Sequence, residues 1–265
     1  LATLLKMPSS KIKVTQSEMG GGFGGKTTLY AEPAAIMLSK KARRPVKIVL
    51  TRSEVFRATG PVCATRSRIK IGVTNAGRIT AAEAEMIFQA GAFPGSMFDN
   101  APKAMFTRYN LENVKTVSYE VVCNRAKVNA FRAPCVPQVV FGVEGIIDEL
   151  AQKLGMDPLE LRLKNAAAEG YKTVFGETFG PIGYVETLEA AMNCDHYKSP
   201  VPEGQGRGVA TGFWFNRGGD TTGSLTITPD GSVTIMLGTS DVAGSRISIS
   251  MMAAEELGIP VEKVR

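Results

Sequence analysis

The sequence has few of the residues from which metal sites and nucleophilic active sites are most often built. It contains one histidine, His196, and four cysteines, none of which forms a CxxC pair. A zinc or iron–sulfur site with familiar ligand spacing is therefore excluded, and we expect no metal ligand from a side chain. Serine–histidine or cysteine–histidine catalysis would depend on His196, whose polar surroundings in NCDHYKSP are typical of a solvated loop.

The sequence also lacks a long apolar run and a pattern of alternating basic and aromatic residues. No stretch is long and apolar enough to span a membrane, and no signal-peptide pattern is present, so we expect a cytoplasmic protein with free thiols. The formal net charge of +6 favours anionic ligands. Because the basic residues do not interleave with aromatic ones, nucleic-acid binding is not expected.

Glycine, by contrast, is concentrated in one loop. Five glycines lie within Gly20–Gly25, and only Phe23 interrupts them. Glycine lets backbone N–H groups approach a ligand closely, and successive N–H groups form a concavity that suits anions. We expect a strand at 11–14 before the loop and a helix at 31–41 after it. Strand, glycine loop and helix form a phosphate-binding arrangement in several unrelated folds.

The loop satisfies two short patterns at once. It fits G-x-G-x-x-G, and with Lys26 and Thr27 it also fits the P-loop pattern of nucleotide hydrolases. A P-loop enzyme needs a second strand that ends in an acidic residue, but the nearest candidate, 146–149, has helical periodicity. A dinucleotide site needs an acidic residue after the next strand, where this sequence has Arg52. The P-loop hydrolase remains an alternative interpretation.

Hydrophobic periodicity predicts an α+β fold, with strands in hairpins and helices in blocks. The expected strands are 45–51, 66–73, 79–90, 113–123, 208–215, 224–228 and 232–237. The alanine-rich segment 79–90 has weak strand propensity, so a helix competes there. The expected helices are 138–154, 157–164 and 245–257, the first with an apolar stripe formed by Phe141, Ile146, Ile147, Leu150 and Leu154.

Two features indicate how the chain is organised. A Pro/Gly-rich joint at 200–208 predicts a first domain at 1–199 and a second at 206–265. Residues 2–13 also align with residues 254–265, with alanine, leucine, proline and lysine at matching positions. Both stretches are predicted to form a helix, a proline-containing turn and a basic strand, which suggests a duplicated unit.

A second motif, NAFRAPCVPQ at 129–138, presents Arg132 on a chain stiffened by two prolines. A rigid arginine suits a phosphate or a pterin that bears a dithiolene. Taken alone, the segment is more simply interpreted as a surface turn with a solvated arginine.

In combination the motifs are far more specific. GGGFGGK, then FRAPxxPQ, then the helical stretch FGVEGIIDELAQKLGMDPLELRLKNA resemble the molybdopterin-binding subunit of the xanthine dehydrogenase and aldehyde oxidase family. Further matches are LTRSEVF at 50–56, AGAFPGS at 90–96, GRGVATGFW at 206–214 and PDGSVTIMLGTSDVAGS at 229–245. The resemblance implies a mixed-sheet domain that binds a molybdenum cofactor, followed by the start of a duplicated second half.

The resemblance implies a molybdenum hydroxylase that oxidises an aldehyde or an N-heterocycle with oxygen from water. The implied cofactor is molybdenum–molybdopterin in its cytosine dinucleotide form. Iron–sulfur clusters and FAD would be carried by partner subunits or domains in an oligomer that also contains the rest of the molybdenum subunit. The residues carried over from the family are, at the cofactor, Gly22, Phe23, Gly24, Gly25, Arg132 and Ala133, and, at the small-molecule substrate, Pro134, Cys135 and Trp214.

The sequence departs from the family in four places. Thr27 replaces the acidic residue of xanthine-type enzymes, and Ala133 stands where carbon monoxide dehydrogenases have cysteine. Residues 243–245 read AGS where the family often has GQG, so a glutamine contact with the cofactor is absent. We find no match for the family's catalytic glutamate. The chain alone is therefore expected to be inactive, and a non-catalytic cofactor-binding fragment is a further alternative.

Overall fold

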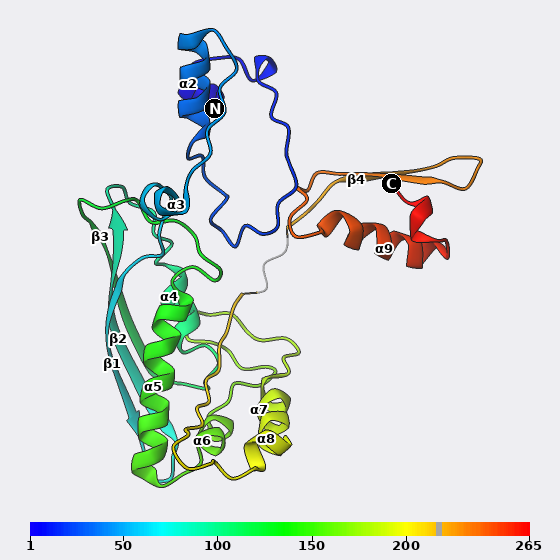
Figure 1. Ribbon diagram of the computed structural model, residues 1–265. Coiled ribbons are helices and arrows are strands. Elements are labelled where there is room, and N and C mark those ends of the chain that lie inside the picture. The colour runs from blue at the N-terminus through cyan, green and yellow to red at the C-terminus, as the bar shows by residue number, and fades with distance from the viewer. Residues whose placement is uncertain (216–218) are drawn as a thin grey trace. The chain divides into compact units, whose positions relative to one another are not determined.

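The computed structural model describes residues 1–215 and 219–265, which separate into two compact units (Figure 1). The first unit comprises Leu1–Thr51 and Asn216–Arg265, and the second comprises Arg52–Phe215. This division groups segments by contact, so the two ends of the chain belong to one unit. The predicted domains 1–199 and 206–265 follow the sequence motifs instead, and they stay a prediction.

The second unit is built on a three-stranded sheet of β1 (Thr65–Val73), β2 (Ile79–Gly91) and β3 (Val114–Val122). β1 and β2 form the predicted antiparallel hairpin, whereas β3 runs parallel to β2, so the sheet is mixed. The helix considered for 79–90 is wrong. Every second residue of β2 from Ala82 to Ala90 is buried, and small alanines are favoured there because a helix packs closely on that face.

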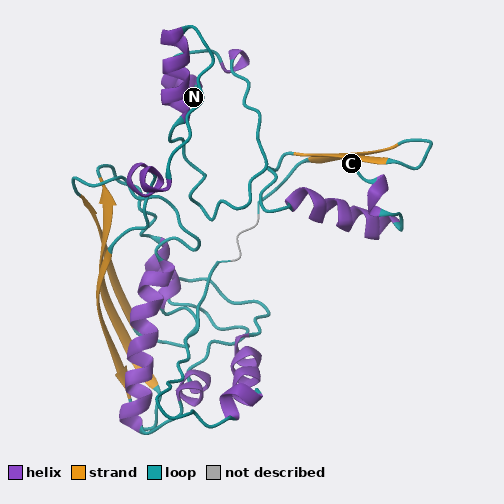
Figure 2. Ribbon diagram, in the orientation of Figure 1, coloured by secondary structure: helices purple, strands orange, loops and turns teal. Residues whose placement is uncertain are grey.

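That helix is α5 (Val136–Leu154), which lies along the sheet (Figure 2). Its buried stripe is Val139, Val143, Ile147 and Ala151. The predicted stripe is therefore partly wrong, because the Phe141 side chain is 84% exposed. A Cβ added at Gly142 would lie 2.8 Å from the Ile69 side chain of β1, so helix and sheet approach closely at this point.

Shorter helices complete the second unit: α3 (Arg52–Ala58), α4 (Asn100–Met105), α6 (Pro158–Lys164), α7 (Tyr184–Asn193) and α8 (Asp195–Lys198). The Asp157 carboxylate caps α6 by accepting hydrogen bonds from the N–H groups of Leu159 and Glu160, as the sequence predicts. The predicted strand at 208–215 is wrong. Two of its backbone groups are bound by buried side chains, described below, instead of by a neighbouring strand.

In the first unit, the hairpin of β4 (Gly223–Ile227) and β5 (Val233–Leu237) packs with α9 (Ser245–Leu257) around Val233, Ala254 and Val264. After the single 3₁₀ turn η2 (Val261–Lys263), Val264 pairs in parallel with Val233. The strand expected at the end of the chain is thus present as one bridge.

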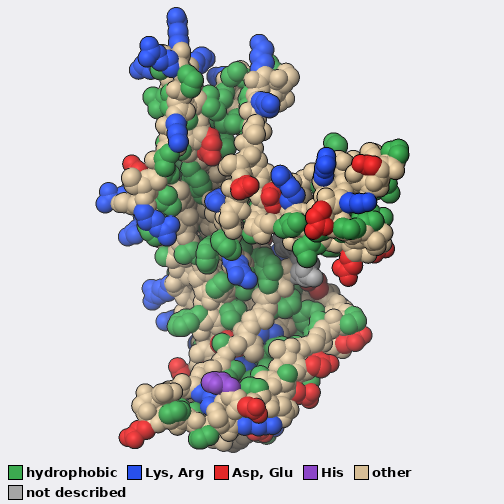
Figure 3. All heavy atoms as spheres, turned by 45° about the vertical axis from the view of Figure 1, so that its right-hand side comes forward, with side chains coloured by type: hydrophobic (Ala, Val, Ile, Leu, Met, Phe, Trp, Pro, Cys, Tyr) green, Lys and Arg blue, Asp and Glu red, His purple; other side chains and the backbone are tan. Residues whose placement is uncertain are grey.

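Residues 1–51 contain α1 (Ala2–Leu5), η1 (Ser9–Lys11) and α2 (Glu32–Ala42). The strands predicted at 11–14 and 45–51 are wrong, because neither segment finds a pairing partner in the described chain. A strand forms only when its N–H and C=O groups pair with a neighbour. None of residues 1–51 is buried, and Figure 3 shows basic and apolar side chains gathered on the surface of α2.

The two aligned stretches, 2–13 and 254–265, fold alike in the predicted helix and turn, whereas the predicted strand is absent from the first and is a single bridge in the second. Each helix ends in a left-handed cap, at Lys6 and at Gly258, and a proline then opens a 3₁₀ turn. The matching hydrogen bonds are Met7 N to Ala2 O and Ile259 N to Ala254 O, both 3.0 Å. The recurrence of the same local geometry supports a duplicated unit. Among the described residues, no helix has the length and apolarity needed to cross a membrane.

Candidate cofactor-binding site

The glycine loop is a tight turn with an unusual backbone. The Gly25 N–H donates to the Gly22 carbonyl at 2.8 Å, and the two central residues have positive φ, 51° at Phe23 and 93° at Gly24. This is the mirror-image turn known as type I′, which normally requires glycine, asparagine or aspartate at both central positions. Phe23 is 64% exposed.

The turn leaves backbone donors available. Within residues 1–215 and 219–265, the N–H groups of Phe23 and Gly24 donate no hydrogen bond. The Gly24 carbonyl, in contrast, already has a partner inside the loop, because the Thr27 hydroxyl donates a hydrogen bond to it at 2.8 Å. Backbone donors without a partner are strong binding groups for an acceptor oxygen.

A second loop, 239–246, anchors the glycine loop inside the first unit. Met19 forms a parallel bridge with Val242, and the Ala243 N–H donates to the Met19 carbonyl at 2.9 Å. The Gln16 side-chain amide donates to the Asp241 carbonyl, also at 2.9 Å. The segment that matches the family as SDVAGS is therefore fixed against the start of the glycine loop.

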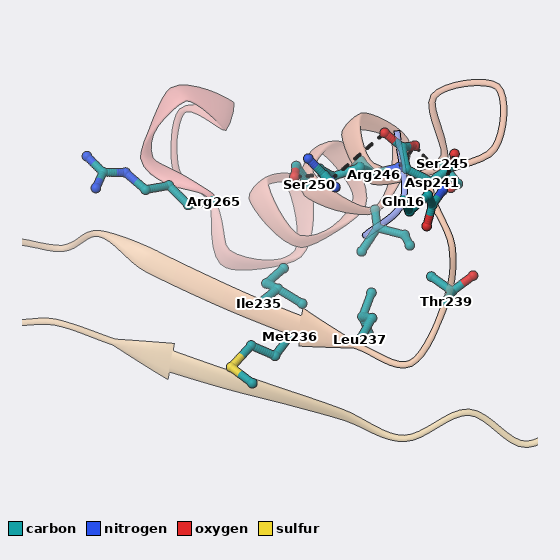
Figure 4. A pocket seen from close by; sticks show the side chains of 11 residues that line it. Gln16, Ile235, Met236, Leu237, Thr239, Asp241, Ser245, Arg246, Ser250 and Arg265 are labelled. Atoms are coloured by element: carbon teal, nitrogen blue, oxygen red, sulfur yellow. Dashed lines mark hydrogen bonds and ion pairs between the residues drawn. The ribbon is translucent and has the colours of Figure 1, made fainter. Parts of the chain in front are cut away.

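Behind this contact lies a pocket between β5 and α9. Figure 4 shows Gln16, Asp241, Ser245 and Arg246 gathered at the first turn of α9, with apolar side chains of β5 forming the other wall. The Asp241 carboxylate accepts hydrogen bonds from the Arg246 N–H and the Ser245 hydroxyl, at 3.1 and 3.3 Å. The pocket thus combines both charge signs with an apolar side.

The arginine motif lies in the second unit, directly before α5. Arg132 is exposed, and Cys135 is the N-cap residue of the helix. Arg132 therefore lies three residues before the N-cap of α5, close in sequence to the positive end of the helix dipole. A guanidinium and a helix N-terminus both favour an anionic ligand. Pro134 is half-buried.

The arginine motif packs against the AGAFPGS segment, a contact that the sequence of neither motif predicts. The Cys135 thiol donates to the Ser96 carbonyl at 3.1 Å, and the Glu120 carboxylate accepts from the backbone N–H groups of Gly95 and Ser96. Burial raises the pKa of Glu120, but the hydrogen bonds from Ser96 and Gly95 outweigh it and hold that pKa below its usual range. Cys135 is 1% exposed, so its thiol faces the core, and its assignment to a substrate pocket stays a prediction.

Backbone strain marks the same segments. Seven described residues other than glycine have positive φ, and four of them lie in these loops: Phe23, Ala133, Cys135 and Ala243. Each such conformation costs an L-residue about 1–2 kcal/mol. Strained residues persist where the surrounding structure holds them, and they cluster at ligand sites. The strain supports a binding role for the loops of both units.

In the described part of the chain, the ring contact of Trp214 is not with the arginine motif. Its ring packs edge-on against Phe215, which with Phe213 and Phe179 forms an aromatic cluster. The structure thus unites the glycine loop with 239–246, and the arginine motif with 90–96, each pair within one unit. Gln16 and Asp241 were not predicted, because side-chain-to-backbone contacts over such sequence separations leave no local pattern.

A buried carboxylate, Glu144 of α5, positions the segment that carries Trp214. It accepts hydrogen bonds from Arg108 Nε at 3.2 Å, from Arg162 Nε at 2.9 Å and from the Thr211 N–H at 2.7 Å. The Tyr109 hydroxyl adds a further bond at 2.6 Å. A glutamate inside the buried stripe of a helix was the one available signal for this network in the sequence.

The comparisons with known proteins agree with this geometry. The molybdopterin cofactor-binding domain profile matches residues 1–166, and a second profile with the same description matches residues 190–265. Since the first match covers more than half of the chain, this chain belongs to the molybdopterin cofactor-binding domain family.

Among curated relatives, the large molybdopterin subunit of nicotinate dehydrogenase from Eubacterium barkeri is 33% identical over 72% of this chain and 46% of its own length. The molybdenum-binding subunit of aldehyde oxidoreductase from Escherichia coli is 30% identical over 100% of this chain and 37% of its own. The chain therefore spans less than half the length of these relatives.

Among solved structures, the aldehyde oxidoreductase from Desulfovibrio desulfuricans has a TM-score of 0.79 and 26% identity over 93% of this chain and 29% of its own. Quinoline 2-oxidoreductase from Pseudomonas putida has a TM-score of 0.82 over 99% of this chain and 38% of its own, and at 23% identity that likeness concerns the fold alone. The predicted α+β, mixed-sheet fold is confirmed.

The P-loop alternative finds no support. A P-loop places its lysine at the start of a helix that follows a strand. Here residues 12–18 form no strand in the described chain, and α2 begins only at Glu32. The Thr27 hydroxyl is also engaged within the loop.

Proposed function

We propose that this chain supplies the cofactor-binding part of a molybdenum hydroxylase catalytic subunit that oxidises an aldehyde or an N-heterocycle. The observation that carries the proposal is the strained turn at Phe23 and Gly24, whose two N–H groups have no acceptor in the described chain. We assign a molybdopterin cofactor to this turn, and the match to the molybdopterin cofactor-binding domain supports the assignment.

The residues present fit such a group. A molybdenum-bound pterin offers oxygen and sulfur acceptors, and its dinucleotide form adds a pyrophosphate. The N–H groups of Phe23 and Gly24 serve as donors to it, with Gly22 and Gly25 allowing close approach. We also assign Arg132 and Ala133, at the positive end of α5, to the cofactor, because a guanidinium and a helix N-terminus favour anionic groups. Pro134, the Cys135 backbone and Trp214 are assigned to the substrate side.

When bound, the cofactor supplies a metal that accepts two electrons from the carbon being oxidised, while the added oxygen comes from water. The chain's residues orient that group and exclude solvent from it. We assign the cytosine dinucleotide form to the cofactor, and iron–sulfur and FAD subunits to the electron path. We assign the general base to the remainder of the molybdenum subunit, and with four free thiols we place the enzyme in the cytoplasm.

The proposal is tested on the enzyme assembled from this chain, the remainder of its molybdenum subunit and its partners. Metal analysis and pterin fluorescence give cofactor occupancy, and dye reduction with aldehydes and N-heterocycles gives activity. Gly24→Ala forces a Cβ onto a residue with a φ of 93°. We expect the free turn to relax away from this strain, so that binding must restore it, and about 1–2 kcal/mol then lowers the binding constant about 5- to 30-fold. Arg132→Ala is expected to lower occupancy as well.

Lys26→Ala is the matched control in the same loop. It would abolish nucleotide binding in a P-loop protein, whereas pterin occupancy is expected to stay unchanged. Full cofactor occupancy in both Gly24→Ala and Arg132→Ala would contradict the assignment of these loops. Cofactor-loaded enzyme without dye reduction on either substrate class would instead favour the non-catalytic alternative.

A further inference from the structure

Two cysteines far apart in the sequence meet beside the arginine motif. The Sγ atoms of Cys63 and Cys135 lie 3.3 Å apart, and the two residues are 5% and 1% exposed. A disulfide bond is about 2.05 Å long, so an approach of roughly 1.2 Å would join them. Cys63 precedes β1 and Cys135 caps α5, so a bond here would link sheet and helix directly.

Only one of the two thiols faces a route from solvent. Cys63 lines a surface pocket whose wall also includes Gln89 and Arg125. Cys135 lies behind it and is covered by the segment that contains Ser96. A small oxidant therefore meets Cys63 first.

The surroundings of Cys63 favour its deprotonated form. The Gln138 amide lies 3.5 Å from its Sγ, and the Thr65 hydroxyl lies 3.9 Å away. The hydrogen bond shared with Cys135 lowers the pKa of Cys63 to about 7 in spite of burial, and the same bond raises the pKa of Cys135. The single Cys135 S–H has both the Ser96 carbonyl and the Cys63 sulfur within reach, and it donates to the sulfur when Cys63 is ionised.

We propose that Cys63 and Cys135 form an oxidisable dithiol, in which Cys63 reacts with a small peroxide and Cys135 resolves the product to a disulfide. The Cys63 thiolate attacks a peroxide oxygen and releases hydroxide, which leaves a sulfenic acid on Cys63. The Cys135 thiol then attacks that sulfur, forming the S–S bond and releasing water. Two thiols and one hydrogen peroxide thus give one disulfide and two waters, and an added dithiol reverses the change.

The disulfide would alter the chain next to Arg132. Cys135 would lose the proton it donates to the Ser96 carbonyl, and the first turn of α5 would be tied to residues 61–64. This modification goes beyond cofactor binding, and its chemistry does not require a bound cofactor. It is therefore measured separately from the proposed function.

The test maps disulfides in the full chain after brief treatment with one to two equivalents of hydrogen peroxide. Free thiols are alkylated in denaturant, and the digested peptides are analysed by mass spectrometry with and without dithiothreitol. We expect one linked peptide pair, Cys63 with Cys135, about 2 Da lighter than the two thiol peptides and absent after reduction. Cys63 is expected to be consumed before Cys123, because it lines a surface pocket and has a second thiol 3.3 Å away to complete the reaction.

Half-buried Cys123 and exposed Cys194 are internal controls in the same sample. Cys135→Ser is expected to leave a sulfenic acid on Cys63 that dimedone traps, and Cys123→Ser is expected to leave the linked pair unchanged. In urea the preference for the Cys63–Cys135 pair should disappear. Sulfenic acid on Cys63 without linkage in the unmutated chain, or linkage of Cys123 or Cys194 in its place, would overturn the proposal. Mapping the unmutated chain requires no variant to fold.

Discussion

At the scale of single residues, Glu144 is a buried carboxylate that binds several groups of the second unit. It is 3% exposed and lies between two buried arginines, Arg108 and Arg162. Glu144→Ala would leave both guanidinium groups buried without their shared carboxylate, which typically costs about 3–5 kcal/mol. Chemical denaturation should show that loss in the free energy of unfolding. Glu149→Ala, on the exposed side of the same helix, is the control and is expected to change stability by less than about 0.5 kcal/mol.

The same carboxylate predicts a pH dependence. Burial raises the pKa of Glu144, but the charge of Arg108, the Tyr109 hydrogen bond and the charge of Arg162 outweigh it and lower that pKa. A glutamate whose folded pKa lies below its unfolded value, about 4.3, stabilises the fold above that pH and loses this contribution as the pH falls. Melting temperatures of the wild type should therefore drop below about pH 4. Glu144→Gln should reduce that slope, and an unchanged slope would contradict the assignment.

At the scale of elements, α5 offers a direct test of which face is buried. Ile147 is fully buried against the sheet, whereas Phe141 on the same helix is 84% exposed. Ile147→Ala is expected to lower the free energy of unfolding by about 2–5 kcal/mol, because it leaves a cavity in a close-packed core. Phe141→Ala, the matched control, should change it by less than about 0.5 kcal/mol. The reverse order of effects would mean that the helix is rotated.

At the scale of the whole molecule, stability is distributed unevenly between the segments. The large core cluster lies within residues 52–215, whereas no residue of 1–51 is buried. We therefore expect a fragment of residues 52–215 to fold alone and to unfold in one cooperative transition. A fragment of residues 1–51 should show no such transition. Circular dichroism melting curves distinguish the two, and non-cooperative melting of 52–215 would refute the expectation.

Local patterns in the sequence were sufficient for most helices and for the hairpins. The hairpin of β1 and β2, the long helix α5 and the capped helix α6 follow from periodicity and from Asp157, because these signals act over a few residues. The motif combination GGGFGGK and FRAPxxPQ was likewise sufficient for the family, which the domain profile confirms. The positive φ values that the glycine turn requires are also a local property, since four consecutive residues define the turn.

Only the tertiary structure decided the remainder, and the reason is the same in each case. The strands predicted at 11–14, 45–51 and 208–215 do not form. A strand requires a pairing partner elsewhere in the chain, and the strand propensity of a segment says nothing about that partner. Contact between Cys63 and Cys135, and between Gln16 and the Asp241 backbone, depends on the path of the whole chain. The outward position of Phe141 was decided by which face of α5 meets the sheet, where the helix approaches β1 most closely. Sequence determined the local conformations and the chemistry available, whereas packing determined which groups are buried, paired or left open to a ligand.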